Sequence, residues 1–227
     1  MNKLVFISSF LVTAIIFSSC SGITGSTEEP VYEFSEESFF VDGKEIKTFR
    51  SLNVISVGLK PDTDADAFHD YINDMGLQLI SAFTHQHYSR IPDSQLSSLS
   101  PVILLLPPGA DNAQFYSFSD NLREDSFANN PFIRYSLPAY SSDPEKEAWY
   151  YPNNLISVKP SAEDFSVSEL SAQFSLEFLS KNSQIDLYLF RDNAFRHGTP
   201  YTLAKNIYES GNFRYVVPDG FWQIVRH

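Results

Sequence analysis

The sequence predicts an α+β fold made of two tandem βαββαβ units that follow a β-hairpin. Three observations lead to this prediction. Short apolar stretches alternate with segments whose apolar residues recur at helical spacing. A strand that ends in Lys-Pro at residues 54–61 is echoed roughly 100 residues later at residues 155–160. Between these two segments, residues 138–153 are rich in Pro, Ser and acidic residues, which is typical of a linker.

The composition is that of a folded, acidic protein. The chain has 227 residues, of which 43% are hydrophobic and 19% charged, and this suffices for one or two packed domains. The formal net charge of −12 disfavours non-specific attraction to nucleic acid or to an anionic lipid surface. We therefore expect no nucleic-acid partner, and solubility is the simplest role for this charge.

The start of the chain has the pattern of an export signal, which we assign to residues 1–19. Lys3 precedes an apolar run, and small residues then lead to Cys20, the only cysteine in the sequence. This ending is similar to a bacterial lipobox, with Phe17 where leucine is more usual. The resemblance implies a lipid on Cys20 as the membrane anchor, a tether over residues 20–37, and a place in the bacterial cell envelope. The outer membrane or the periplasmic face is favoured over the inner membrane, and an ordinary signal peptide is the alternative.

The hairpin and the first unit span residues 38–137. Asp42-Gly43 accepts positive φ and predicts the hairpin turn. Residues 62–64, Asp-Thr-Asp, can cap a helix that Gly76 ends. The expected elements are a hairpin at 38–46, a strand at 54–59, this helix, strands at 77–83 and 102–106, a second helix at 111–122 and a strand at 132–135.

The second unit spans residues 154–222 and repeats this order, which is called ferredoxin-like. Thr199 can cap the last helix, Pro200 suits its first turn, and we expect Gly211 to end it in the left-handed conformation. The expected elements are a strand at 155–160, a helix at 167–174, strands at 176–179 and 184–190, the helix just described and a strand at 213–217. The helices of each unit can cover only one face of its sheet, so the other face must be solvated, hidden by the other unit or used for binding. Chance similarity is the alternative to a repeat.

Residues 197–222 carry a resemblance to a known family. A helix, the letters Y-E-S-G-N-F, a strand and a Pro-Asp pair follow one another, and this passage resembles the end of the N-terminal prodomains of subtilisin-type serine proteases from Bacteroidetes-like bacteria. The hairpin at Asp42-Gly43 is similar to the opening of those prodomains. The resemblance implies a non-catalytic module that inhibits or chaperones a subtilisin-type protease, here without the catalytic domain. An envelope lipoprotein that binds some other protein is the alternative.

In such prodomains the sheet packs on the protease and the C-terminal tail enters its active site. The resemblance therefore implies that the tail at residues 223–227 binds the partner. Two aromatic residues before this tail are candidates for an exposed anchor, although most aromatic residues are expected in the core. The candidate partner-binding residues are Phe221, Trp222, Gln223, Ile224, Val225, Arg226 and His227.

The sequence holds no convincing catalytic or metal-binding motif. The letters H-G-T-P at residues 197–200 look like the H-G-T-H of subtilisin-type enzymes, but the Asp and Ser motifs of a triad are missing and a helix start is favoured. His85 and His87 lack a third ligand, so loop histidines are favoured over a metal site. The acidic residues at 62–66 lack the Gly and Glu of a calcium loop. We expect no enzyme activity, no cofactor and no metal.

Overall fold

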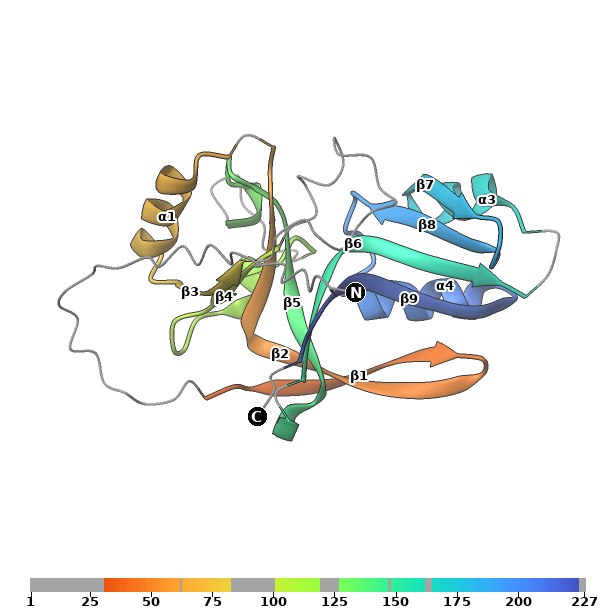
Figure 1. Ribbon diagram of the computed structural model, residues 1–227, viewed down its shortest axis with the longest axis horizontal. Helices are drawn as coiled ribbons and strands as arrows, with labels where there is room; N and C mark the ends of the chain where they lie inside the picture. The colour runs from red at the N-terminus through yellow and green to blue at the C-terminus, as the bar shows by residue number, and fades with distance from the viewer. Residues whose placement is uncertain are drawn as a thin grey trace, which may run out of the picture. The chain divides into compact units, whose positions relative to one another are not determined.

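The structure is a computed structural model that describes residues 31–61, 63–82, 101–118, 127–146, 148–161 and 165–224. The chain divides after Val31, and residues 32–227 form one compact unit. Within the described part of this unit, nine strands form one sheet in which neighbouring strands run antiparallel (Figure 1).

The elements alternate between long strands and short helices. The strands are β1 (Phe34–Val41), β2 (Lys44–Leu59), β3 (Gln78–Ala82), β4 (Pro101–Leu105), β5 (Ile133–Asp143), β6 (Ala148–Pro160), β7 (Leu176–Asn182), β8 (Leu187–Asp192) and β9 (Phe213–Ile224). The helices are α1 (Ala65–Asp74), α3 (Val167–Phe174) and α4 (Pro200–Ser210), with short 3-10 turns η1 (Asn112–Phe115), η2 (Phe127–Asn129) and η3 (Pro144–Lys146).

The prediction of two tandem βαββαβ ferredoxin-like units is wrong, because the strands join in one continuous, mostly antiparallel sheet. Their order is β3-β4-β2-β1-β9-β6-β8-β7, and β5 pairs with both β2 and β6. Residues 138–153, which we expected to be a linker, lie largely in β5 and β6. Two prolines account for the wrong prediction of a linker. Pro138 and Pro152 each stand beside a shift in strand register, where a missing backbone N–H does not interrupt the ladder.

The hairpin of β1 and β2 completes a closed ring of backbone-paired strands, in the order β1-β2-β5-β6-β9 and back to β1. β1 pairs along its whole length with β2, and it meets β9 where Val41 lies opposite Tyr215. β2 pairs with β5, β5 with β6, and β6 with β9. The expected turn is present, since Asp42 and Gly43 have φ values of 47° and 77°. Backbone pairing therefore connects the N-terminal hairpin to the C-terminal strand.

The second half of the sheet contains the elements expected between residues 155 and 217. Ser166 caps α3, and Thr199 caps α4 with Pro200 in its first turn. Both helices pack on β6, β8 and β9 through one apolar core that includes Phe190 and Ile207. Gly211 was expected in the left-handed conformation, and this is wrong: its φ of −167° is extended backbone that any residue can adopt.

The first half of the sheet departs further from expectation. α1 is present, and the Asp64 side chain accepts a hydrogen bond from the Ala67 backbone N–H at 2.8 Å. The helix expected at residues 111–122 is instead a single 3-10 turn, η1, after which Tyr116 is extended. Residues with low helix propensity, such as Asn112 and Ser117, account for this difference. Residues 119–122 lie outside the described part of the chain.

Candidate functional site

The candidate partner-binding residues 221–224 do not form a free tail. β9 continues to Ile224, and its last four residues pair with residues 148–151 of β6. The Phe221 side chain is only 7% exposed and packs in a core cluster with Trp149 and Tyr151, so it is not available as an exposed anchor. Cys20 and residues 225–227 lie outside the described residues, as do His85 and His87.

The motifs that we interpreted as structural behave as helix caps. The Thr199 hydroxyl accepts a hydrogen bond from the Thr202 backbone N–H at 3.1 Å, as a cap should. The His197 ring lies against Phe174, with 5.4 Å between ring centroids.

Among the described residues, no three His, Cys, Asp or Glu side chains lie together as metal ligands. None of the described helices has the length and apolar character needed to span a membrane.

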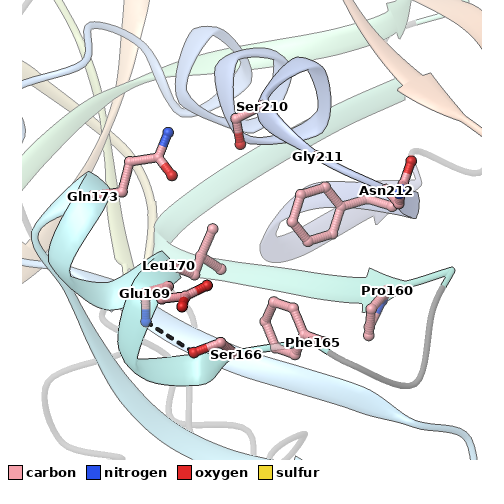
Figure 2. Close-up of a pocket in the computed structure, with 10 residues that line it drawn as sticks. Pro160, Phe165, Ser166, Glu169, Leu170, Gln173, Ser210, Gly211 and Asn212 are labelled. Atoms are coloured by element: carbon pink, nitrogen blue, oxygen red, sulfur yellow. Dashed lines mark hydrogen bonds between the residues drawn. The ribbon is translucent and has the colours of Figure 1, made fainter.

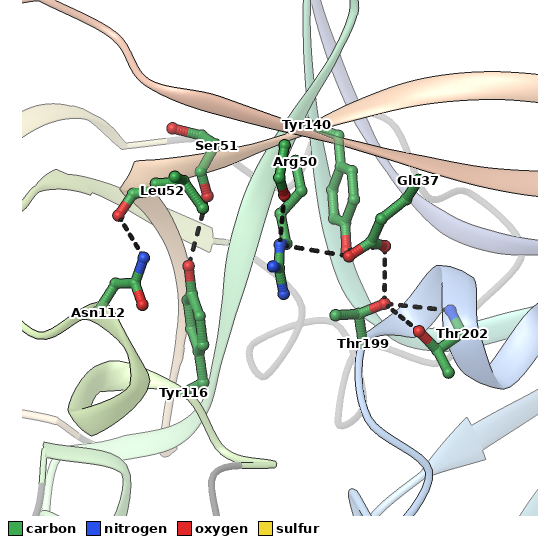
Figure 3. Close-up of polar contacts among 10 residues, drawn as sticks. Glu37, Arg50, Ser51, Leu52, Asn112, Tyr116, Tyr140, Thr199 and Thr202 are labelled. Atoms are coloured by element: carbon green, nitrogen blue, oxygen red, sulfur yellow. Dashed lines mark hydrogen bonds and ion pairs between the residues drawn. The ribbon is translucent and has the colours of Figure 1, made fainter.

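A buried polar cluster joins the hairpin to the start of α4 (Figure 3). Glu37 of β1 accepts hydrogen bonds from the Thr199 hydroxyl at 2.8 Å and from the Tyr140 hydroxyl at 3.2 Å. Its other carboxylate oxygen lies 3.2 Å from Nε of Arg50. Burial raises the pKa of Glu37, while Thr199, Arg50 and Tyr140 oppose this rise. Three elements of the ring and one helix thus meet at a single carboxyl group.

The chemistry of this cluster is structural. Both carboxylate oxygens of Glu37 already have partners, and Tyr140 is fully buried. Burial also raises the pKa of the Tyr140 hydroxyl well above its usual value, so this group stays protonated as a donor. A catalytic acid or base needs space for a substrate atom within hydrogen-bond reach. The cluster therefore holds the two halves together and is no candidate active site.

A small pocket lies between α3 and the junction of α4 with β9 (Figure 2). Its volume is about 200 Å³, below the usual range for drug-sized ligands. Two phenyl rings, one carboxylate and several neutral polar groups surround it. The lining residues are Pro160, Phe165, Ser166, Glu169, Leu170, Gln173, Ser210, Gly211, Asn212 and Phe213.

The opposite face of the second half forms a candidate interface, which we call the helix-free face. Apart from Phe213, which lies across a register shift in β9, the residues of β6, β8 and β9 that pack on α3 and α4 are the even-numbered ones, such as Val158, Phe190 and Val216, because side chains alternate along a strand. Their odd-numbered neighbours therefore point away from these helices. Leu189, Ser157 and Val217 form one cross-strand row on this face, and Lys159 and Tyr215 form the next. All five are partly exposed.

The two outer edges of the sheet, β3 and β7, also expose apolar side chains. Leu79 on β3 is 44% exposed, and Phe178 on β7 is 41% exposed. Each edge carries a register shift, next to Ile80 in β3 and next to Leu179 in β7. A bulge of this kind hinders the addition of another strand. The helix-free face is therefore the better candidate for protein binding.

The comparisons with known proteins assign no family to the chain. No family model matches it, and no match was found among curated proteins or solved structures.

Proposed function

We propose that the chain is a non-catalytic, lipid-anchored binding module of the bacterial cell envelope, and that it docks another protein on its helix-free face. The observation that carries this proposal is the row of Leu189, Ser157 and Val217, which faces away from α3 and α4 and is partly exposed. Apolar side chains grouped on an accessible face are typical of protein-binding surfaces. The export pattern and Cys20 support the anchor and the location.

The partner that the sequence resemblance implies is a subtilisin-type serine protease, which the module inhibits or chaperones. Gln223 and Ile224 are already paired with β6 along one edge of their backbone, so they belong to the sheet and do not form a free tail that could enter a protease cleft by itself. The proposal therefore assigns the main contact to the helix-free face. An envelope protein other than a protease is the second candidate, because an apolar face does not specify its partner.

The experiment is a titration of a subtilisin-type protease from the same genome with the mature protein. We expect inhibition by the wild type, and Leu189→Glu should weaken it by at least about tenfold because a charge would be buried at the contact. The matched control is Ala172→Glu, which adds the same charge to an exposed position of α3 on the other side of the sheet. Absence of inhibition by the wild type rejects the protease as partner, and equal inhibition by the wild type and Leu189→Glu rejects the face.

A further inference from the structure

The pocket beside α3 has two aromatic walls that meet at a corner. The rings of Phe165 and Phe213 lie 5.9 Å apart at their centroids, and their planes are inclined by 77°. Both rings also line the pocket, and neither is fully buried. The face of an aromatic ring carries partial negative charge and attracts a cation within about 6 Å. A corner of two rings is thus suited to a compact cation.

A carboxylate stands beside this corner. Ser166 and Glu169 have the spacing of a capping box, and the Glu169 backbone N–H donates to the Ser166 hydroxyl at 3.3 Å. Within the described residues, the reciprocal bond from the Ser166 backbone to the Glu169 carboxylate is not formed. The Glu169 side chain instead points toward the side of the pocket where the Phe165 ring lies (Figure 2). Its charge is therefore available to a ligand.

The charges around the pocket select a cation over an anion. None of its ten lining residues is Lys, Arg or His, and the whole chain has a net charge of −12. The positive end of the α3 dipole opposes a cation, but Glu169 lies in the first turn and offsets this dipole. Gln173, Ser210 and Asn212 add neutral hydrogen-bonding groups.

We propose that this pocket binds an organic ammonium group, with the cation against Phe165 and Phe213 and its charge balanced by Glu169. The volume of about 200 Å³ admits one ammonium head or the end of one lysine side chain. The pocket lies on the helix side of the sheet, and the proposed docking face lies on the other side. Each proposal can therefore be tested independently of the other.

Choline and its uncharged analogue 3,3-dimethylbutan-1-ol test this proposal, because they have nearly the same shape and differ in charge. Each is titrated into the mature protein while amide chemical shifts are followed by NMR. We expect saturable shifts at residues around the pocket with choline, and affinity for the alcohol weaker by about tenfold. Equal affinity for the two compounds, or no saturable shifts at about 10 mM choline, overturns the proposal.

Two substitutions locate the site. Glu169→Gln keeps a residue suited to the third position of a capping box and removes the charge, so α3 should persist while choline binding falls by about tenfold. The matched control is Glu209→Gln, the same change at an exposed residue of α4 that does not line the pocket. Unchanged choline binding by Glu169→Gln overturns the assignment.

The same titration with Nα-acetyl-lysine methylamide distinguishes the two sources of an ammonium group. Tighter binding of the lysine amide than of choline identifies a lysine side chain of another protein. Tighter binding of choline identifies a quaternary ammonium ligand. Both results support the ammonium site, since a charged head is bound in each case.

Discussion

The two halves of the sheet have the same strand order but are covered in different ways. The order is β3-β4-β2-β5 in the first half and β7-β8-β6-β9 in the second. Two helices, α3 and α4, cover the second half. The first half has α1 and, in the described residues, a cluster of aromatic side chains from turns and loops: Phe115, Tyr116, Phe118, Phe127 and Phe132. Large rings from irregular segments can thus fill the volume that a helix fills elsewhere.

The strength of the helix signals explains this difference. α4 has Thr199 as a cap, Pro200 in its first turn and five buried side chains over eleven residues. The η1 turn begins with an Asp111 cap of similar quality, since Asp111 accepts a hydrogen bond from the Ala113 backbone N–H at 3.1 Å. It then continues into residues that favour turns. A cap starts a helix, but the residues that follow decide whether the helix extends.

The largest effect should come from glycines that sit in tight spaces, one in each half. A Cβ at Gly220 would lie 2.3 Å from the carbonyl oxygen of Tyr151, and one at Gly58 would lie 2.1 Å from the ring of Tyr135. Backbone cannot move aside as a side chain can, so Gly220→Ala should cost about 3 kcal/mol of unfolding free energy and Gly58→Ala about 2 kcal/mol. Urea unfolding followed by circular dichroism measures both.

The control for this pair is Ser142→Ala, at an exposed position of β5, which should change the unfolding free energy by less than about 0.5 kcal/mol. Because one sheet contains both halves, each glycine variant should shift the same single transition. Two separate transitions, each sensitive to only one glycine, would show that the halves unfold independently.

The second effect compares the helix caps of the two halves. Asp64 is an exposed cap, and Asp64→Ala should cost about 1 kcal/mol. Thr199 is 4% exposed and also donates to Glu37, so Thr199→Ala removes a cap and a buried hydrogen bond and should cost about 2 kcal/mol. Thermal or urea unfolding of the two variants gives the difference. Equal losses would mean that the bond to Glu37 adds nothing to stability.

Local signals in the sequence predicted local structure well. Asp42-Gly43 predicted the hairpin, and the caps at residues 62–64 and at Thr199 predicted α1 and α4. Residues 138–153 were misinterpreted because proline and serine usually mark a loop. Strand pairing overrode that preference: Pro138 lies opposite Ile55, far away in the sequence, and nothing near the proline reveals this partner.

The contacts of the candidate sites depended on the tertiary fold and could not be predicted. Thr199 was predicted as a cap, but its bond to Glu37 joins residues 162 positions apart and exists because the hairpin closes the ring. Phe221 was proposed as an exposed anchor, and the continuation of β9 along β6 buries it. The pocket combines Phe165 and Glu169 with Phe213, and their spacing in the sequence carries no recognisable motif.

The smallest expected effect on stability concerns the buried polar cluster around Glu37, which joins the two halves, and it depends on pH. Burial raises the pKa of Glu37 above its ordinary value of 4.5, so the folded state holds this proton more tightly than the unfolded state. The stability contributed by the proton is complete below pH 4.5 and is lost as the pH rises through the raised pKa. Glu37→Gln has no proton to lose, so its unfolding free energy relative to the wild type should increase as the pH is raised from 4.5. Urea unfolding over this pH range checks it, with the exposed neighbour Glu36→Gln as the matched control. A constant difference between Glu37→Gln and the wild type, or a decrease with pH, would contradict the raised pKa of Glu37.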